Sequence, residues 1–486
     1  MFPPPVAKIL QLLADSGYQA YVVGGAVRNL LLGYAPKEYD LATDACPKVL
    51  QRLAGENHIR AFPKGEAFGV VSLLVDGMEV EVATFRSEVY GTDAHRPEKV
   101  DFLWALEDDL ARRDFTINAM AFDREGRLYD PFGGRADLQR GVLRAVGNPD
   151  ERFAEDALRA FRACRFVAEY GFSIEPETLA AISRARDRTA GLSVERVRDE
   201  IERILLSPHP AAGFECLRET GFLETLCRAR TASKEETVPV LPELSRLYKV
   251  PQNPRYHSFD VWRHTMEVLR EVPPEPVMRW AALLHDIAKG MEGVRGLNRR
   301  GELSDYRHEQ AGTATAEEVL GRFRVPPADS RRIIWLVRRH MVFPKAEEPG
   351  VIKWLRLLAE DFRNRGDLAE AVAQLLQLHE ADLKGGKVDP ERRLADNDLL
   401  KTMVGDLLDR VPFYPADLAI GGDAVVKHLG EGPQVKVVLD DLVRDIQAGR
   451  LANERGEVEE ELKKKLDLEE KYFIHKETQR KRRKQK

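Results

Sequence analysis

A glycine pair and an acidic pair lie close together near the N-terminus, and these residue types can handle a triphosphate and metal ions. Gly24 and Gly25 follow a short apolar segment, and paired glycines let backbone N–H groups approach a phosphate closely. Arg28 is near enough to the pair to reach the same phosphates. Glu38 and Asp40 share one face of a predicted strand, because alternate side chains point the same way. The two carboxylates predict a Mg²⁺ site that activates a hydroxyl and binds the triphosphate.

Short elements must position these groups. The sequence predicts a strand at 21–23, a helix at 26–32 and a second strand that carries the acidic pair. A third acid would complete the metal site, and Glu79 and Glu81 in the alternating segment 78–85 share a face. We prefer Glu81, because it directly precedes the VATFR segment. The alternative for Glu38 and Asp40 is that they are two solvated acids after the helix. The alternative for Glu79 and Glu81 is that they are exposed on a half-buried edge strand.

A basic segment further along offers partners for an incoming nucleotide. Arg112, Arg113 and Asp114 precede an apolar stretch that contains Asn118. An Arg–Asp pair at this point can hold a triphosphate and ribose hydroxyls through charge-assisted hydrogen bonds. Taken alone, three such residues at a helix boundary are common.

A second set of charged residues could select a base. Asp156 and Arg159 lie within one turn of a predicted continuous helix, and Arg162 and Arg165 continue the series at every third position. Asp accepts hydrogen bonds and Arg donates them, so the pair matches the pairing edges of cytosine and adenine, which uracil and guanine present in the opposite order. The alternative is an amphipathic helix with ordinary salt bridges.

Histidines gather in the helical block between about 250 and 390. An adjacent His–Asp pair after an apolar helix is usually structural, but here it is preceded by one histidine and followed by two more and a late aspartate. Imidazole and carboxylate together suit a transition metal such as Mn²⁺, Fe²⁺, Co²⁺ or Ni²⁺. The candidate ligands are His264, His285, Asp286, His308, His340 and Asp382. Of these, His308 and His340 are needed only for a second metal, and Lys289 can meet a phosphate.

Composition excludes several classes of protein. The 486 residues include 75 Lys and Arg and 80 Asp and Glu, and the net charge of −5 does not indicate a nucleic-acid-binding protein. No apolar run reaches the ~18 residues of a membrane span, and the N-terminus lacks the basic segment of a secretion signal. Four scattered cysteines without CxxC spacing predict reduced thiols in the cytoplasm. The basic run 475–486 is either a solvated tail or a weak phosphate contact.

The order of strands and helices predicts an α/β head followed by mostly helical parts. Strand patterns occur up to about residue 140, and helical patterns dominate afterwards. A proline-rich patch marks a boundary near 250, and a charged link follows the histidine block. The predicted parts are a head at 1–140, a neck and body at 141–250, the histidine domain at 251–386 and a tail at 387–486.

Together these segments resemble the class II tRNA nucleotidyltransferases, which include the CCA-adding enzymes and the bacterial poly(A) polymerases. The resemblance rests on VVGGAVRNLLLG with the acidic pair, on EVATFRSEVYGTDAHRPEKVDF, on EDDLARRDFTINAMA and on the segment around Asp156. DLAIGGDAVVKHLGEGPQV near the end is similar to the family's tail region. The resemblance implies a head of the DNA polymerase β type, with neck, body and tail domains that hold the tRNA acceptor stem.

The implied activity is template-independent addition of C and A, from CTP and ATP, to the 3′ end of tRNA with two Mg²⁺ ions at the acidic pair. An Asp/Arg pair matching Asp156 and Arg159 reads the incoming base. Its triphosphate and sugar are handled by residues matching Gly25, Arg28, Arg113, Arg162 and Arg165. The alternatives are an enzyme that adds A alone, a poly(A) polymerase, and a protein with an inactive head that binds tRNA or regulates through its histidine domain. The oligomeric state stays open.

Two positions depart from the family, which usually has Asp where this sequence has Glu38 and Asn29. Glu is longer by one methylene, about 1.5 Å, while Mg²⁺ demands near-octahedral geometry. We therefore expect slower chemistry or an altered metal preference, and for Asn29 an effect on a structural hydrogen bond. The segment 86–101 matches the flexible loop of enzymes that add the terminal A, which favours CCA or A addition over CC addition.

The order of the histidines resembles the HD superfamily of metal-dependent phosphohydrolases. The resemblance implies hydrolysis of phosphoesters, including cyclic 2′,3′-phosphates at RNA ends. Such an activity would let one chain clean a damaged 3′ end and then rebuild it.

Overall fold

The computed structural model describes residues 2–63, 69–90, 97–102, 104–230, 235–387, 390–429 and 432–466. Within the chain there are two compact units, which are described separately. Unit 1 comprises Met1–Tyr248, Pro274–Arg279 and Glu317–Pro327, and unit 2 comprises Lys249–Pro273, Trp280–Ala316 and Ala328–Lys486. Part of the predicted loop 86–101 and the whole basic run 475–486 lie outside the described residues. The predicted boundaries at 140 and 386 stay predictions.

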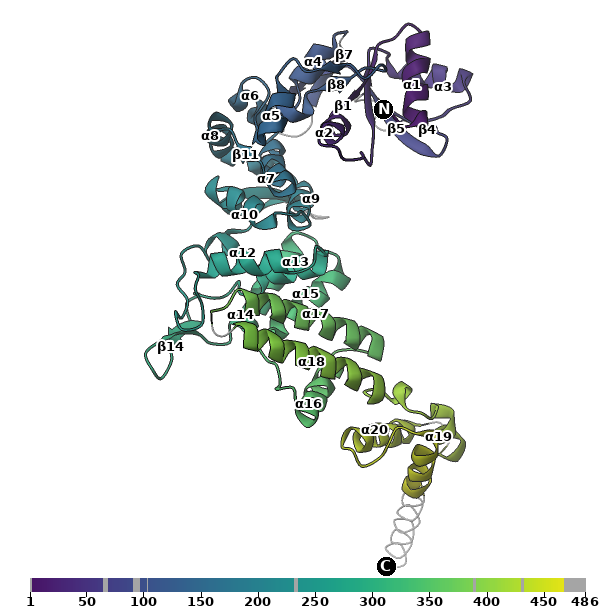
Figure 1. Ribbon diagram of the computed structural model, residues 1–486, viewed down its shortest axis with the longest axis vertical. Helices are drawn as coiled ribbons and strands as arrows, with labels where there is room; N and C mark the ends of the chain where they lie inside the picture. Colours follow the sequence, from purple (N-terminus) through teal and green to yellow (C-terminus); the bar gives the residue numbers. More distant parts are fainter. Residues whose placement is uncertain are drawn as a thin grey trace, which may run out of the picture. The chain divides into compact units, whose positions relative to one another are not determined.

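A seven-stranded mixed sheet forms the first part of unit 1, in the order β3-β4-β5-β2-β1-β8-β9 (Figure 1). β5 (Met78–Thr84) lies inside this sheet between β4 and β2, so the alternative of an edge strand is wrong. β6 (Arg86–Tyr90) and β7 (Pro97–Phe102) form a separate antiparallel pair. The other strands of the sheet are β1 (Ala20–Val23), β2 (Asp40–Thr43), β3 (Arg60–Pro63), β4 (Val70–Val75), β8 (Ala121–Phe122) and β9 (Leu128–Tyr129).

The register of the sheet determines where the acidic residues Asp40 and Glu81 lie relative to each other. β2 pairs antiparallel with β1, where Val23 faces Asp40, and parallel with β5, where Asp40 faces Glu81. The strand begins at Asp40, so the prediction that it carries Glu38 is wrong by two residues. The physical reason is that Gly24 leaves the extended conformation with φ +68°, and β1 therefore offers no further pairing partner before Asp40.

Helices cover the sheet and close its core. α1 (Pro4–Asp15) and α2 (Gly25–Leu31) contact β1, and α3 (Pro47–Glu56) contacts β3 and β4. α1 and α3 each begin with proline, which is pre-organised for the first helical turn. Val23 and Ala42 of the sheet pack with Phe85 and with Leu110 of α4 (Leu106–Ala111) in one buried cluster. This core holds the ends of β1 and β2 rigidly beside each other.

The predicted continuous helix around Asp156 is two helices, α6 (Pro149–Glu155) and α7 (Leu158–Tyr170), so that prediction is wrong. Asp156 is extended, with φ −143° and ψ 106°, and its Oδ1 accepts from the Leu158 N–H at 2.9 Å. The carboxylate thus caps a new helix instead of continuing the old one. The other helices of this part are α5 (Gly134–Arg140), α8 (Pro176–Arg184), α9 (Val194–Leu205), α10 (Pro210–Glu219) and α11 (Pro242–Ser245).

Strand pairs interrupt the helices of unit 1 after the head. β10 (Val142–Leu143) pairs with β11 (Ser173–Ile174), and β12 (Leu226–Arg230) pairs with β13 (Glu235–Pro239). Ser193 caps α9 by accepting from the Arg196 N–H.

In its described residues unit 2 is mainly helical, with one small strand pair, β14 (Arg295–Leu297) with β15 (Leu303–Asp305). α17 packs against both α12 and α18. A separate apolar cluster that includes Val425, Leu442 and Val458 forms the core of the last part. The helices from residue 261 onward are α12 (Val261–Glu271), α13 (Pro276–Leu284), α14 (His308–Arg322), α15 (Pro327–Arg339), α16 (Glu348–Ala359), α17 (Arg365–Lys384), α18 (Pro390–Arg410), α19 (Gly422–Leu429) and α20 (Pro433–Gln447).

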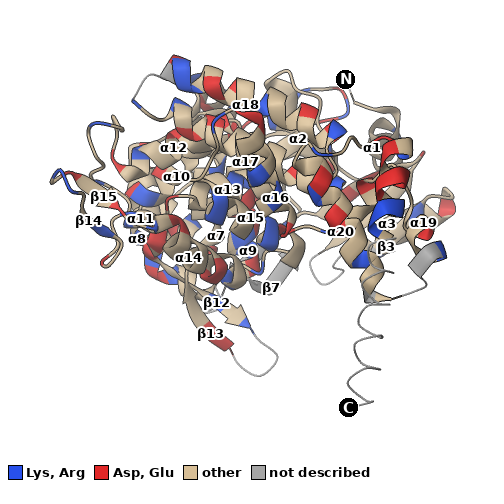
Figure 2. Cartoon of the chain, turned by 90° about the horizontal axis from the view of Figure 1, so that it is seen from below, with Lys and Arg blue, Asp and Glu red and all other residues tan. Residues whose placement is uncertain are grey.

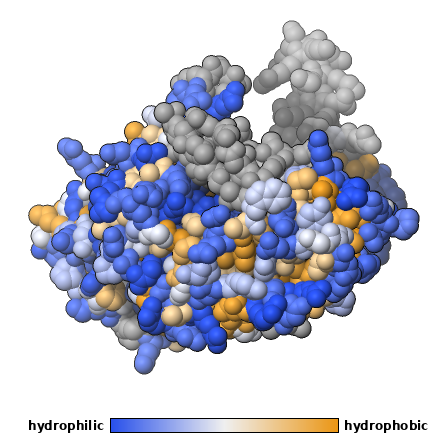
Figure 3. Space-filling model, turned by 90° about the horizontal axis from the view of Figure 1, so that it is seen from above, coloured by the Kyte–Doolittle hydropathy of each residue, from blue (hydrophilic) through white to orange (hydrophobic). Residues whose placement is uncertain are grey.

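Charge and hydropathy are mixed over the surface. Figure 2 shows basic and acidic residues interleaved along the helices. On the face drawn in Figure 3 hydrophilic residues predominate, and apolar residues occur in small groups among them. Of the helices that the structure describes, none combines the length and apolar character that a bilayer crossing requires.

Candidate functional site

The glycine pair forms the turn between β1 and α2, and two guanidinium groups lie against it. A Cβ on Gly24 would lie 2.9 Å from Nη1 of Arg113, and a Cβ on Gly25 would lie 3.5 Å from Nη2 of Arg28. Because glycine carries no side chain, the backbone of the turn stays open beside both cations. This arrangement suits a polyphosphate.

Arg28 is buried and is held by uncharged groups. Nη1 donates to Asn118 Oδ1 at 2.6 Å, while Nε and Nη2 donate to Asn29 Oδ1 at 3.3 and 3.2 Å. The guanidinium also lies 5.1 Å from the ring centroid of Phe166 and 5.0 Å from that of Tyr170. Burial lowers the pKa of Arg28 from its usual value, but an arginine stays charged at neutral pH. Asn29 therefore makes structural hydrogen bonds to a cation without neutralising it.

Arg113 is positioned by an acid that the sequence analysis missed. Asp109 is buried and accepts from Nε of Arg112 at 2.9 Å and from Nη2 of Arg113 at 3.1 Å. Burial favours the neutral carboxyl, but the two guanidinium groups hold the pKa of Asp109 below its usual value. The i,i+3 and i,i+4 spacing of this acid to the two arginines is the signal that could have identified it.

The acidic pair lies exposed at the start of β2. Glu38 and Asp40 are exposed, while Tyr39 between them is buried. Glu81, half-buried, lies beside Asp40 in the adjacent strand. Carboxylate oxygens are the ligands that Mg²⁺ prefers. Since these acids do not form three mutually close ligand atoms in the described part of the chain, phosphate oxygens of a substrate would complete the set.

Asp114 is buried and fully engaged. Its Oδ2 accepts from Nε and Nη2 of Arg162 at 2.9 and 2.7 Å, and its Oδ1 accepts from Asn118 Nδ2 at 3.0 Å. Burial would raise its pKa, but Arg162 and Asn118 hold the pKa of Asp114 far below its usual value. Through Asn118 the same network reaches Arg28. Asp114 and Arg162 therefore form one charged network with the residues of the glycine turn.

The proposed base-reading residues do not pair with each other. Asp156 Oδ2 lies 3.3 Å from Nη2 of Arg196, a residue of α9 that the sequence analysis did not assign to the site. Arg159 is buried and donates to Glu155 Oε2 at 2.6 Å and to the Arg112 carbonyl at 3.0 Å. The helix break at Asp156 separates these side chains from the single face that a continuous helix would give them.

Arg165 lies away from the other arginines of α7. Its Nε donates to Glu200 Oε2 and its Nη1 to Glu169 Oε1, both at 2.6 Å, and its guanidinium lies 4.3 Å from the ring centroid of Phe166. Steps of three residues rotate about 60° per step around an α-helix, so an i,i+6 pair no longer shares a face. Arg165 therefore joins α7 to α9, and a role in nucleotide binding stays a prediction.

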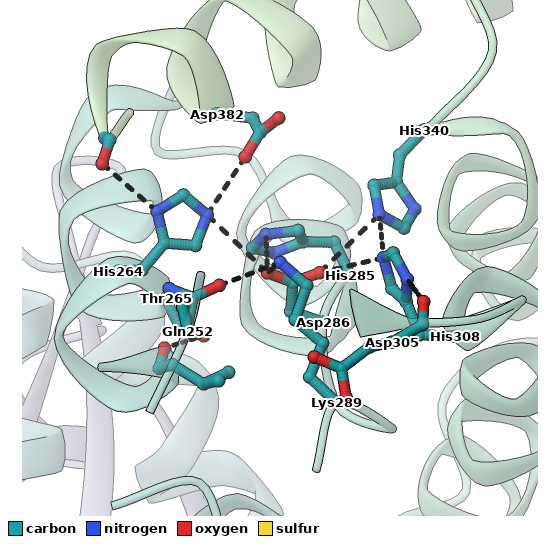
Figure 4. Close-up of polar contacts among 12 residues, drawn as sticks. Gln252, His264, Thr265, His285, Asp286, Lys289, Asp305, His308, His340 and Asp382 are labelled. Carbon is teal, nitrogen blue, oxygen red and sulfur yellow. Dashed lines mark hydrogen bonds and ion pairs between the residues drawn. The ribbon is translucent and has the colours of Figure 1, made fainter. Parts of the chain in front are cut away.

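Asp286 lies at the centre of the histidine cluster in unit 2 (Figure 4). It forms one group of ligand atoms with His264 and His285 and another with His308 and His340, and the atoms of each group lie within 4.8 Å of one another. Asp382 Oδ1 lies 2.9 Å from His264 Nε2. The carboxylate oxygens of Asp286 lie 3.2 Å from His285 Nε2, 3.6 Å from His264 Nε2, 3.2 Å from His308 Nε2 and 3.7 Å from His340 Nε2. All six predicted ligands therefore meet in one place.

The second ring nitrogen of each histidine faces a backbone carbonyl. The Nδ1–O distances are 3.4 Å from His264 to Gly385, 2.8 Å from His285 to Ala282, 3.0 Å from His308 to Asp305 and 2.7 Å from His340 to Val337. A carbonyl acceptor fixes the proton on Nδ1, which leaves Nε2 as a lone-pair ligand. Both oxygens of Asp286 and the Nε2 atoms of His264 and His285 are buried and make no hydrogen bond of normal geometry among the described residues, although they lie within ion-pair distance of one another, of Asp382 and of Lys289. These observations fit a bound metal.

A pocket of about 430 Å³ opens onto this cluster. Lys289 lines it, donates to Gln252 Oε1 at 3.0 Å and lies 2.7 Å from Asp286 Oδ2. His257 also lines the pocket, with its ring centroid 5.2 Å from that of His264, and the sequence analysis missed it. A pocket of this size with a lysine beside the ligands can admit a phosphoester.

Three family models match the chain in succession. They are the poly A polymerase head domain at 20–144, the probable RNA and SrmB-binding site of polymerase A at 171–231 and the HD domain at 255–397. A CCA-adding enzyme of Geobacillus thermodenitrificans is 31% identical over 456 residues, which are 93% of this chain and 94% of that protein. The chain belongs to the CCA-adding enzymes.

Solved CCA-adding enzymes share the fold. That of Bacillus stearothermophilus in complex with CTP aligns with a TM-score of 0.66 and 26% identity, over 97% of this chain and all of that chain. That of Thermotoga maritima complexed with tRNA-CCA aligns with a TM-score of 0.56 and 18% identity, over 96% of each chain. Membership of the CCA-adding enzymes confirms the predicted nucleotidyltransferase head, the helical domains and the HD domain. The roles of single residues stay predictions.

Proposed function

We propose that the head of this CCA-adding enzyme transfers CMP from CTP and AMP from ATP to the 3′ end of tRNA at the edge formed by Glu38, Asp40 and Glu81. The register of the sheet supports this most strongly. It sets Asp40 opposite both Val23, which precedes the glycine turn, and Glu81 of β5. The metal ligands and the phosphate-binding turn therefore belong to one edge.

The chain's own residues bind and orient the substrates. Bound Mg²⁺ would supply Lewis-acid stabilisation of the triphosphate charge, held by the three carboxylates. The open backbone of Gly24 and Gly25, with Arg28 and Arg113 beside it, binds the triphosphate. Such positioning accounts for most of the catalysis in phosphoryl transfer, because the reacting oxygen must lie in line with the phosphate.

Base selection is assigned to Asp156 and Arg159, with Arg196 as a third member. Oδ2 of Asp156 lies 3.3 Å from Nη2 of Arg196. The amino group of cytosine or adenine would replace that contact, because a carboxylate accepts what an amino group donates. Uracil offers a carbonyl at the same place and would face the carboxylate unfavourably.

Single-nucleotide incorporation tests this function. A tRNA that lacks its CCA end is incubated with Mg²⁺ and with labelled CTP alone, ATP alone or both. We expect C addition with CTP alone and extension to CCA only with both nucleotides. Addition of A alone to a tRNA ending in CC, without C addition, would instead identify an A-adding enzyme. Unlimited A addition would identify a poly(A) polymerase.

The HD cluster is assigned a second activity, hydrolysis of phosphoesters. The Nε2 atoms and the shared Asp286 support it, since they present lone pairs to a transition metal such as Mn²⁺, Ni²⁺ or Co²⁺. Such a metal supplies Lewis acidity, while Lys289 binds the phosphate and the pocket orients it. Nucleotides with 2′,3′-cyclic phosphates are the expected substrates.

Metal content and hydrolysis test the second activity together. His285→Ala should lose bound metal and the hydrolysis of 2′,3′-cyclic nucleotides. The matched control is His58→Asn, since His58 is exposed in the head at φ +55°, a conformation that asparagine tolerates. If the metal-loaded wild type leaves phosphomonoesters and cyclic nucleotides untouched, the proposed activity is wrong.

A further inference from the structure

A second pocket lies beside the HD pocket, and neither function above uses it. Its volume is about 440 Å³, and Arg393 lines both pockets. Phe343 and His379 lie stacked in it, with ring centroids 3.7 Å apart and an interplanar angle of 18°. We name it the aromatic pocket. Its polar lining also includes Lys345, Glu347, Arg392, Asp396 and Asn397.

The chemistry of the aromatic pocket suits a nucleobase. A flat aromatic pair offers a stacking surface for any base, and base–aromatic stacking is worth about 1–3 kcal/mol. Burial lowers the pKa of His379 to about 4, so its ring is neutral at pH 7. Nδ1 of His379 and Oδ1 of Asn397 are buried without a hydrogen-bond partner among the described residues, and Asn397 is only 3% exposed. Unpaired buried polar atoms of this kind favour a polar ligand.

The two pockets are lined by neighbouring residues of the same chain segments. On α17, His379 precedes the metal-ligand candidate Asp382 by three residues, which places their Cβ atoms about 5–6 Å apart. Phe343 follows another candidate, His340, by three residues. Each member of the aromatic pair therefore lies close along the chain to a member of the metal cluster.

Arg393 lies at the boundary between the pockets. Gly386 lines the HD pocket, and a Cβ on it would lie 3.8 Å from Nη1 of Arg393. The pKa of His379 is lowered mainly by burial, and the positive charge of Arg393 lowers it further. A guanidinium at this point can bind a phosphate that bridges the two pockets.

We propose that the aromatic pocket binds the base of a nucleotide whose phosphate lies in the HD pocket, so that the HD centre acts on nucleotides and RNA 3′ ends in preference to phosphoesters without a base. The inference rests on the proposed phosphohydrolase activity. It adds to that activity a binding site for the base and the residues that form it, Phe343, His379 and Arg393.

Two phosphomonoesters that differ in the base provide the first test. The full chain, loaded with Mn²⁺ or Ni²⁺, is assayed with 2′-AMP and with glycerol 2-phosphate. Phe343→Ala should lower kcat/KM for 2′-AMP about tenfold and leave kcat/KM for glycerol 2-phosphate unchanged. His379→Phe keeps a stacked pair and should retain most of the preference. An unchanged ratio in Phe343→Ala would overturn the inference.

The matched control is Phe362→Ala. Phe362 is a half-buried aromatic residue of unit 2 that packs edge-on against Trp335 at 5.1 Å and lines neither pocket. Its replacement should leave the ratio of the two substrates at the wild-type value. An equal fall of the ratio in both variants would mean that the effect comes from packing, and it would count against the aromatic pocket.

A binding measurement separates the pocket from the activity. Trp354 lies 6.0 Å from Phe343 between ring centroids, so its fluorescence reports on the pocket. AMP should change this fluorescence in wild type and in His285→Ala, but not in Phe343→Ala or Trp354→Phe. If the protein hydrolyses phosphoesters, the ratio of kcat/KM for the two substrates tests the aromatic pocket. If it hydrolyses none, the proposed activity is wrong and the AMP titration alone tests the pocket. An unchanged fluorescence of the wild type on addition of AMP would then overturn the inference.

Discussion

Arg28 differs from the other arginines around the head site in the charge of its partners. Its hydrogen bonds are made to the amide oxygens of Asn29 and Asn118, and among the described residues no carboxylate contacts it directly. A phosphate therefore gains more from Arg28 than from a guanidinium that must first leave a carboxylate. The contrasting pairs are Arg113 with Asp109, Arg162 with Asp114 and Arg165 with Glu200.

The two glutamates of β5 give a matched pair of variants. Glu81 faces Asp40 across the parallel pair of strands, and Glu79 lies two residues earlier on the same strand. Glu81→Gln should lower kcat for nucleotide addition about 100-fold, or about 2.7 kcal/mol. Glu79→Gln, measured in the same incorporation assay, should stay within about threefold of wild type. If Glu79→Gln lowers kcat more than Glu81→Gln does, Glu79 and not Glu81 is the third carboxylate.

Glu38 allows a gain-of-function variant. Glu38→Asp shortens the side chain by one methylene, about 1.5 Å, and restores the residue that the family usually has. Because Mg²⁺ tolerates little distortion, the variant should raise the Mg²⁺-supported rate relative to the rate with the more tolerant Mn²⁺. The two rates are compared in one incorporation assay. A fall in the Mg²⁺ rate would show that the site is built around glutamate.

The sequence identified candidate residues by their own type and spacing. It did not identify most of the residues that position them. The types and spacing of Glu38 and Asp40 identified them as a candidate pair, but the strand predicted to carry both begins only at Asp40. Arg196 was missed because its contact with Asp156 exists only when α9 is folded against the site. Asp109 was missed although its spacing to Arg112 and Arg113 is visible in the sequence. Histidine order alone predicted the metal cluster, but the carbonyl acceptors of Nδ1 required the structure.

At the scale of elements, the break between α6 and α7 is the main departure from the sequence prediction. A helical pattern runs through Asp156, but the carboxylate caps the Leu158 N–H and the backbone leaves the helix there. Local competition by an Asp side chain is invisible to hydrophobic periodicity. The break turns Asp156 toward α9, where it meets Arg196.

Close packing between α5 and the segment around Thr116 gives a prediction for an element. A Cβ on Gly134 would lie 2.1 Å from the Thr116 carbonyl oxygen, which no side-chain movement can relieve. Gly134→Ala should therefore lower the free energy of unfolding of unit 1 by about 3 kcal/mol or more. The control is Gly55→Ala in α3, where the new Cβ meets no atom within 4 Å. That variant should stabilise by up to about 1 kcal/mol, as measured by denaturant titration.

At the scale of the whole molecule, the two chemistries belong to different compact units. The acidic edge lies in unit 1 and the HD cluster in unit 2. Unit 1 includes the chain up to Tyr248, while the domain boundary that the proline-rich patch near residue 250 predicts stays a prediction. The sequence did not predict that short segments from later helices, such as Glu317–Pro327, belong to unit 1, because only the folded chain brings them together.

Metal removal should distinguish the units. A metal bound at about 1,000 times its Kd stabilises the unit that holds it by about 4 kcal/mol. Chelation should therefore increase amide hydrogen exchange in α12 and α17 and leave the strands β1, β2 and β5 unchanged. His285→Ala should show the increased exchange without chelator and no further response to it. Equal changes in both units would contradict a tightly bound transition metal at the HD cluster.

Incorporation of labelled CTP and ATP into a tRNA that lacks CCA tests the central claim most directly. Wild type with Mg²⁺ should extend the tRNA by C, C and A. Asp40→Ala should bind the tRNA with wild-type affinity and lose at least about 100-fold in rate, because Asp40 joins the glycine turn to the carboxylate of β5. Undiminished incorporation by Asp40→Ala, or tRNA binding by wild type without any incorporation, would contradict the account.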